Sequence, residues 1–265
     1  MNISPFFVIA RYKENIDWLS LRDYFNSGII YNKGPDDISY KGKIVKSSNF
    51  PDWGRESETY IRFILENYSD LPDYIVFTQA DPFEHSPNFI EVIDILSTQN
   101  RWKDYQPLTS GCFKIQINGS VRCGAVICFD DLGFPIHTDQ VPPLESMLYN
   151  KTEYIDNYPI FFETIDSSMD AFYFKDEVIY KILESYRKQQ HIFLAANTLA
   201  RTYKRLGLSK PFCGYAKFNY GAIFGIKKSN ILQHTKSFYE KLHEFTIENP
   251  SHGYIMERMW YTILN

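Results

Sequence analysis

The sequence predicts an α/β fold in which a mostly parallel, doubly wound central sheet is flanked by helices. Short apolar runs rich in β-branched residues alternate with segments of helical spacing over the first 100 residues. Parallel strands need long crossovers, so this alternation is typical of a parallel sheet. The 265 residues are enough to bury a large core. No internal boundary is visible, so we expect one domain over residues 1–265, with halves of about 1–100 and 101–265.

The first half contains the clearest elements. Each predicted strand is a short apolar run bounded by polar or turn-forming residues. Each predicted helix has apolar residues three or four positions apart, and Ser86 and Pro87 are typical of an N-cap and a first helical position. In chain order we expect a strand at Phe6–Ala10, a helix at Asn15–Phe25, strands at Gly28–Asn32 and Gly42–Ser48, a helix at Arg55–Tyr68, a strand at Tyr74–Thr78 and a helix from Ser86 to about Ser97.

The second half is less regular. Apolar runs predict a strand at Gly124–Asp131 and strand-like structure at Tyr215–Ile226, while residues 166–207 have helical spacing. Two further helices, Ser229–Glu248 and about Gly253–Leu264, are expected at the end.

Composition excludes several functional classes. The net charge of −4 and the pI of about 5.9 give no basic surface for nucleic acid. The four cysteines form no Cys-x-x-Cys motif, so we expect reduced thiols. No apolar run has the length of a signal-peptide core or a membrane span. We therefore expect a cytoplasmic protein.

The stretch "YIVFTQADPFEHSP" (74–87) is the first candidate site. Asp81 follows a buried strand, at the sheet edge where parallel α/β folds bind ligands. Glu84 and His85 follow before a helix N-terminus, which favours anions. Carboxylate oxygens and an imidazole suit Mn²⁺ or Mg²⁺, cations that neutralise phosphates. The alternative is an ordinary acidic turn in which the three side chains are solvated.

Several motifs, in the same order, carry a family resemblance. "FFVIARYKENIDWL", "IIYNKG", "NFPDWGRESETYIRFILENYSDLPDYIVFTQADPFEH" and "GAIFGIKKSNILQHTKSFYEKL…YIMERMW" resemble an uncharacterised family of fungi and large DNA viruses. The same series is similar to chlorella-virus capsid glycosyltransferases of the GT-A fold, whose central sheet is Rossmann-like. The resemblance covers residues 6–95 and 212–262 and fails over 100–210. If the chain is viral, its compartment would be the host cytoplasm.

The resemblance implies a nucleotide-sugar site at the strand ends. Gln79-Ala80-Asp81 stands where GT-A enzymes have Asp-x-Asp, so the first carboxylate is an amide here and the carboxylate that touches the metal is kept. Arg11 and Tyr12 would contact the nucleotide base, ribose or phosphate, although Arg11 could instead pair with Glu14 or Asp17. Gln79 could bond the ribose or a metal-bound water.

Two basic residues are further phosphate candidates. Lys33 follows the second strand and could reach a phosphate or be a solvated turn residue. Arg55, in the first turn of a helix, suits a bidentate phosphate contact or a structural ion pair with Glu56.

A carboxylate is also needed to take the proton from an acceptor hydroxyl. The resemblance assigns this role to Glu257 in "YIMERMW", which would otherwise be an exposed helix glutamate. Asp131, in the pair Asp130-Asp131, is the rival, and His137 and His252 are further possible metal ligands.

The implied function is a metal-dependent hexosyl- or pentosyltransferase in glycan biosynthesis. It would move a sugar from a donor, expected to be UDP-linked, to a glycan or glycoprotein. The substitution of Gln79 for an acidic residue favours a different class, a non-catalytic nucleotide- or sugar-binding protein of the same fold. The site chemistry also permits a metal-dependent hydrolase of nucleotide-sugars or phosphoesters.

Overall fold

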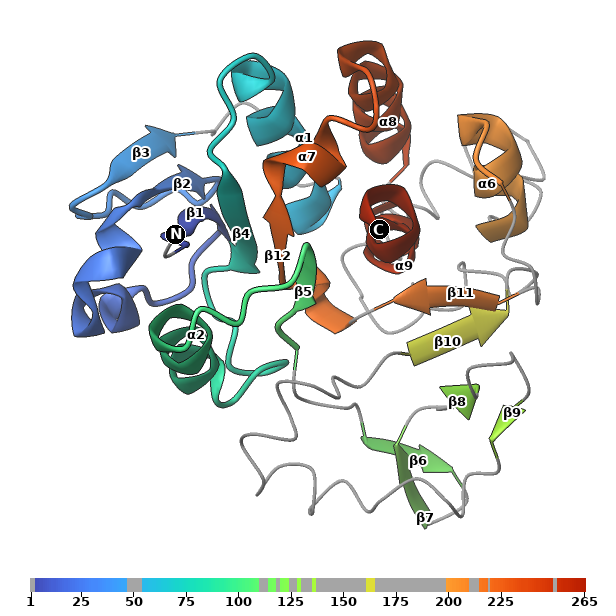
Figure 1. Ribbon diagram of the computed structural model, residues 1–265, viewed down its shortest axis with the longest axis horizontal. Coiled ribbons are helices and arrows are strands. Elements are labelled where there is room, and N and C mark those ends of the chain that lie inside the picture. Colours follow the sequence, from blue (N-terminus) through green and yellow to red (C-terminus); the bar gives the residue numbers. More distant parts are fainter. Residues whose placement is uncertain are drawn as a thin grey trace.

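The computed structural model describes residues 3–46, 54–109, 199–209, 220–249 and 252–265, together with six short strands between residues 114 and 218. Its centre is a six-stranded sheet in the order β3-β2-β1-β4-β12-β5, with helices on both faces (Figure 1). The predicted α/β class is therefore confirmed. The strands of this sheet are β1 (Phe6–Arg11), β2 (Gly28–Asn32), β3 (Lys43–Lys46), β4 (Tyr74–Gln79), β5 (Tyr105–Pro107) and β12 (Phe224–Lys227).

The prediction of a mostly parallel sheet is confirmed in part, for four of the six strands. The neighbours β3, β2, β1 and β4 pair in parallel. Strand β12 pairs antiparallel with both β4 and β5, so the sheet is mixed. The reason is the direction of entry: β12 follows a short 3-10 turn, Tyr220–Ala222, at the carboxyl ends of the parallel strands and runs back from there.

Alternating residues of the strands supply two cores. In β1, Phe7 and Ile9 pack with the segments after β1 and with α2 (Phe89–Thr98), whereas Val8 packs on the opposite face with α1 (Arg55–Asn67). Both faces of the central strands are thus buried, as expected of a three-layer α/β structure.

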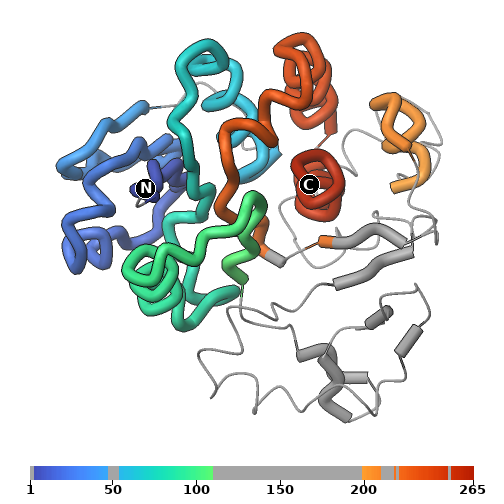
Figure 2. Tube along the Cα trace, in the orientation of Figure 1, coloured from blue at the N-terminus to red at the C-terminus, as the bar shows by residue number. Residues whose placement is uncertain are grey.

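The C-terminal helices complete the layer that contains α1. Helices α8 (Lys236–Glu248) and α9 (His252–Leu264) pack against α1 and against each other, and α6 (Leu199–Leu206) packs against α9. Figure 2 shows this return of the C-terminal segment, in red, to the side of the N-terminal half. Residues far apart in the chain can therefore meet at one edge of the sheet.

Three predicted helices differ from the structure. Residues 15–25 form two 3-10 segments, Asp17–Leu21 and Asp23–Asn26, which Trp18 fixes by donating from Nε1 to the Ala80 carbonyl over 2.7 Å. Helix α2 begins at Phe89, because the Ser86 hydroxyl is buried and donates to the Leu108 carbonyl at 2.6 Å.

The predicted helix 229–248 is divided into α7 (Lys228–Ile231) and α8. Thr235 caps α8 by accepting the Phe238 amide at 3.3 Å, so a new helix starts there.

The remaining predictions are only partly within the described residues. The predicted strand 215–226 is interrupted, since β11 (Tyr215–Phe218) and β12 flank the turn at Tyr220–Ala222. Of the predicted strand 124–131 only β8 (Cys128–Phe129) is described, and of the helical stretch 166–207 mainly α6.

The other strands that the structure describes form three two-stranded sheets: β6 (Lys114–Ile117) with β7 (Ser120–Cys123), β8 with β9 (Pro135–Ile136), and β10 (Phe161–Thr164) with β11. Among the described helices, none is long and apolar enough to cross a membrane.

Candidate functional site

The carboxyl ends of the parallel strands bring the predicted site residues to one edge. Arg11 is opposite Asn32 across β1 and β2, and Ala10 is opposite Gln79 across β1 and β4. From β1 the chain builds outward through β2 and β3, and then β4 is added on the other side of β1. The strand order therefore reverses between β1 and β4, which is where open α/β sheets bind ligands.

The turn at Gly221 is the point where distant candidates meet. Gln79 Nε2 donates to the Gly221 carbonyl at 2.8 Å, and the Gly221 amide donates to Glu257 Oε1 at 2.6 Å. The amide of Gln79 can donate this bond, whereas an ionised carboxylate at position 79 could not and would set an anion against a carbonyl oxygen. The Gln79 side chain thus has a structural role, which is to hold the Gly221 turn.

Backbone conformation and packing both restrict this turn. Gly221 and Ala222 have φ angles of +71° and +49°. A Cβ added to Gly221 would lie 2.6 Å from His85 Cδ2. His85, the third candidate here, therefore lies against the turn, and position 221 requires glycine for its conformation and for the space.

Glu257 is held more firmly than an exposed helix glutamate would be. Besides the Gly221 amide, it accepts from Arg258 Nη1 at 2.6 Å, through Oε2. The two side chains are 12% and 2% exposed. The interpretation of Glu257 as a solvated surface residue is wrong, because both carboxylate oxygens anchor other parts of the structure.

Arg11 connects the ends of β1 and β2. Its guanidinium forms two bonds to the Asp36 carboxylate, at 3.1 and 2.7 Å, and one to Asn32 Oδ1 at 2.8 Å. Its Nε donates to the main-chain carbonyl of Glu14, so the predicted pairing with the carboxylate of Glu14 or Asp17 is wrong. Hydrogen bonds from Arg11 hold the pKa of Asp36 below its ordinary value. Arg11 is buried and engaged in shaping the loop.

Lys33 belongs to a buried ionic cluster that we define as Lys33, Glu58, Arg62 and His243. Lys33 Nζ lies 2.8 Å from Glu58 Oε2 and its side chain is 7% exposed, so the prediction of a solvated turn lysine is wrong. Arg62 and His243 contact the other oxygen of Glu58. Burial opposes ionisation of Glu58, but the hydrogen bond from His243 and the charges of Lys33 and Arg62 outweigh it and lower the pKa of Glu58 to about 2.

Arg55 and Glu56 begin α1 beside the first turn of α9. Arg55 Nε lies 3.7 Å from Glu56 Oε2, as the ion-pair interpretation predicts. Arg55 also bonds the Tyr254 hydroxyl and lies over its ring, 4.8 Å from the centroid. Burial raises the pKa of Glu56, and the charge of Glu257 raises it further while Arg55 lowers it. A carboxyl with this shift is a candidate for proton transfer.

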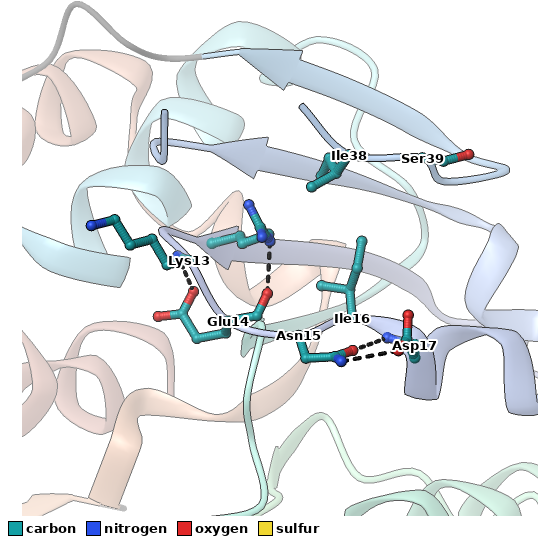
Figure 3. Close-up of a pocket in the computed structure, with 8 residues that line it drawn as sticks. Lys13, Glu14, Asn15, Ile16, Asp17, Ile38 and Ser39 are labelled. Carbon is teal, nitrogen blue, oxygen red and sulfur yellow. Dashed lines mark hydrogen bonds between the residues drawn. The ribbon is translucent and has the colours of Figure 1, made fainter. Parts of the chain in front are cut away.

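A groove opens beside the end of β1. It has a volume of about 420 Å³ and is lined by Arg11, Lys13–Asp17, Ile38 and Ser39 (Figure 3). Asn15 and Asp17 bond each other on one wall, with the Asp17 amide 2.6 Å from Asn15 Oδ1. Tyr12, which is predicted to contact the nucleotide, lies between the lining residues Arg11 and Lys13 in the chain. It is 42% exposed, with Lys13 Nζ 5.1 Å from the centre of its ring. The walls of the groove offer polar groups, and the ring of Tyr12 lies outside its lining.

The predicted metal ligands Asp81, Glu84 and His85 are not gathered into a metal-binding group. Asp81 is exposed and accepts the Phe83 amide through Oδ1 at 3.1 Å, which closes a turn. Glu84 is exposed, whereas His85 is half-buried against Gly221. Over the ranges that the structure describes, no three His, Cys, Asp or Glu side chains are placed to hold a metal ion. Asp81 lies just past the end of β4 as an exposed carboxylate that a ligand can reach.

The remaining predicted residues are partly outside the described ranges. Asp130, Asp131 and His137 lie outside them. His252 is buried, with Nδ1 2.5 Å from the Phe245 carbonyl and its ring stacked on that of Phe245.

Sequence reasoning missed the importance of Gly221 and Glu56. An isolated glycine within a strand pattern indicates a bend and could have identified Gly221. Nothing in the local sequence shows that Glu56 lies near Glu257.

Comparisons with known proteins add little about function. Residues 7–129 match a family described as "Protein of unknown function (DUF3431)". This segment is less than half of the chain and contains the ends of β1, β2 and β4. No curated protein and no solved structure matches the chain.

Proposed function

We propose that the protein is a glycosyltransferase of the GT-A type. It transfers a sugar from a nucleotide-sugar donor, a UDP-sugar, to a hydroxyl of a glycan or glycoprotein. One observation carries the proposal. Gln79 and His85, at and just after the end of β4, and Glu257, on α9, meet at Gly221, at the edge where the strand order reverses. Ligands of open α/β sheets bind at such a point.

The groove at the end of β1 suits the nucleoside. It lies at the same edge, and its walls offer carboxylate, amide and main-chain groups for a base and a ribose. The exposed ring of Tyr12 can stack on the base. Arg11 acts indirectly, because its bonds to Asp36 and Asn32 fix the shape of the loop.

The diphosphate belongs between this groove and the Gly221 turn. Asp81 provides a single carboxylate there, and Mg²⁺ or Mn²⁺ bound with substrate phosphates commonly uses only one or two protein carboxylates. The Asp81 carboxylate thus fits a metal that binds together with the nucleotide. Among the described residues there is no group of ligands that would hold the metal without the nucleotide. When bound, the metal would neutralise the charge that develops on the departing diphosphate.

The acceptor hydroxyl requires a proton acceptor near the sugar. The carboxylates of α1 and α9, Glu56 and Glu257, are close enough to interact at this edge. Either could take the proton as the acceptor oxygen attacks the anomeric carbon.

A non-catalytic nucleotide- or sugar-binding protein is the second candidate. The observation in its favour is that Gln79 provides no charge for a metal and instead fastens the Gly221 turn.

One experiment separates the candidates. The protein is incubated with a panel of nucleotide-sugars and Mn²⁺, with and without glycan acceptors, and nucleotide release is followed. Release that depends on an acceptor supports a transferase. Release without an acceptor indicates a hydrolase, and binding without release indicates a binding protein.

Thermal unfolding provides a first prediction. UDP at ~100 times its Kd should stabilise the protein by about 2.7 kcal/mol, and the shift in Tm should be larger with Mn²⁺ than without it. Equal shifts with and without Mn²⁺ would remove the metal from the proposal.

The variant Asp81→Asn provides a second prediction. It removes one anionic ligand at nearly constant volume, so Mn²⁺-dependent UDP binding should weaken while the Tm of the free protein is maintained. Asp73→Asn is the matched control, because Asp73 is an exposed carboxylate just before the amino end of the same strand. Isothermal titration of both variants with UDP and Mn²⁺ measures the difference. Equal affinities of the two variants would show that Asp81 only closes its turn.

A further inference from the structure

Glu56 is a nearly buried carboxylate with few partners. It lies in the first turn of α1, and its side chain is 11% exposed. Apart from its own amide, its one partner in the described part of the chain is Arg55, at 3.7 Å, which is longer than a hydrogen bond. Its oxygens therefore keep unused acceptor capacity, and part of the side chain is accessible from solvent.

Glu257 is the opposite case. The Gly221 amide and the Arg258 guanidinium occupy its two oxygens, each at 2.6 Å. Arg258 is buried, and its ion pair with Glu257 would be lost if Glu257 accepted a proton. Protonation of Glu257 would thus disturb the turn and the arginine together, which makes it a poor group for repeated proton transfer.

The surroundings of Glu56 suit a group that accepts and releases a proton. Its charged neighbours are Arg55 on its own helix, Glu257 on α9 and Lys33 after β2. Burial and the charge of Glu257 raise the pKa of Glu56, and the opposing effect of the two cations is smaller. The Tyr60 hydroxyl, one turn further along α1, is fully buried, and it has no hydrogen-bond partner among the described residues.

We propose that Glu56 accepts the proton of the acceptor hydroxyl, and that Glu257 is a positioning residue that holds Gly221 and Arg258. This inference rests on the glycosyltransferase function proposed above. As the acceptor oxygen forms its bond to the anomeric carbon, the bond from that carbon to the diphosphate oxygen breaks and its electron pair leaves with the diphosphate. The hydroxyl proton passes to the Glu56 carboxylate. A carboxylate of raised basicity suits this transfer better than an ordinary surface glutamate.

The test compares Glu56→Gln, Glu257→Gln and Glu240→Gln. Glu240 is an exposed glutamate on α8 and is the control for loss of a helix carboxylate. The probes are the UDP-sugars of the panel with Mn²⁺ and glycan acceptors. The rate of UDP release is measured across pH, together with the Kd for UDP and the Tm.

Glu56→Gln should lower kcat by ~10²–10⁴-fold, with the Kd for UDP unchanged. Its Tm at neutral pH should be no lower than that of the wild type, because glutamine resembles the protonated acid that burial favours. A base acts when ionised, so the rate of the wild type should rise with pH through the pKa of Glu56. Glu257→Gln should keep this rise of the rate with pH and have a lower Tm than the wild type. In Glu56→Gln the rise should be absent.

Two outcomes would overturn the inference in different ways. If the wild type is active and Glu56→Gln has full kcat with an unchanged pH profile, Glu56 is not the base although the transferase function holds. If the wild type releases no UDP with any donor, the proposed function fails and this inference fails with it.

Discussion

Glu58→Gln is expected to lower the free energy of unfolding by about 3–5 kcal/mol, the usual cost of breaking a buried charge cluster by removing one partner. Glu58 is the single anion of the cluster, and its side chain is 1% exposed. Its loss removes the buried anion that the ammonium of Lys33 and the guanidinium of Arg62 both contact. Urea unfolding at neutral pH measures the change. The control is Glu240→Gln, an exposed position on α8, which should change stability by less than about 0.5 kcal/mol.

The same variant has a defined pH dependence. The pKa of Glu58 falls from its ordinary value of 4.5 to about 2 in the folded protein. The folded state therefore binds this proton less tightly than the unfolded state. The stabilisation is complete above pH 4.5 and is lost as pH falls towards 2. At 1.36 kcal/mol per pKa unit it is about 3 kcal/mol. The difference in the free energy of unfolding between the wild type and Glu58→Gln should therefore shrink as pH falls over this interval. A difference that does not change with pH would show that the charge of Glu58 does not stabilise the fold.

Gly221→Ala is expected to destabilise the protein by about 2–5 kcal/mol and to lower UDP release by ~10²-fold. The positive φ at this position costs an alanine about 1–2 kcal/mol. The overlap of the new Cβ with the His85 ring adds about 1–3 kcal/mol, because neither the turn nor the ring can move freely. Since Gln79 and Glu257 hold the two sides of Gly221, a shift of the turn displaces both, and misplacement by about 1 Å can cost 10²-fold in rate.

The chain contains a matched control for this variant. Gly207 has a φ of +69° and no atom within 4 Å of an added Cβ. Gly207→Ala therefore carries the conformational cost without the overlap, and it should lose about 1–2 kcal/mol and keep the wild-type rate. Chemical denaturation and the UDP-release assay report both quantities. If the two alanine variants behave alike, contact with His85 is unimportant and the turn does not organise the site.

The predicted fold followed from local patterns wherever these were unambiguous. Strands β1, β2 and β4 and helix α1 begin and end within one residue of the predicted bounds, since their apolar periodicity is strong. The predicted helix at residues 15–25 was wrong because a tertiary hydrogen bond, from Trp18 to Ala80, stabilises a 3-10 path that local spacing cannot indicate.

The sequence alone also predicted which candidate residues lie at one edge of the sheet. It placed Arg11, Lys33, Gln79 and Asp81 at the ends of strands, because the carboxyl ends of parallel strands meet on one side of a sheet. Their individual roles required the structure. Arg11 and Lys33 are buried cations that pair with Asp36, which is about half exposed, and with Glu58, which is buried. Pairing of this kind depends on contacts between segments 25 residues apart in each case.

What the sequence determined by itself is the α/β class, the parallel half of the sheet and the polar residues at its carboxyl edge, because period-2 and period-3.6 patterns reflect burial on strands and helices. The tertiary structure decided the direction of β12, the meeting of Gln79 and Glu257 at Gly221, and the proximity of Glu56 to Glu257. These features join residues separated by more than 100 positions, and such contacts form when packing of the C-terminal helices against α1 closes the chain on itself.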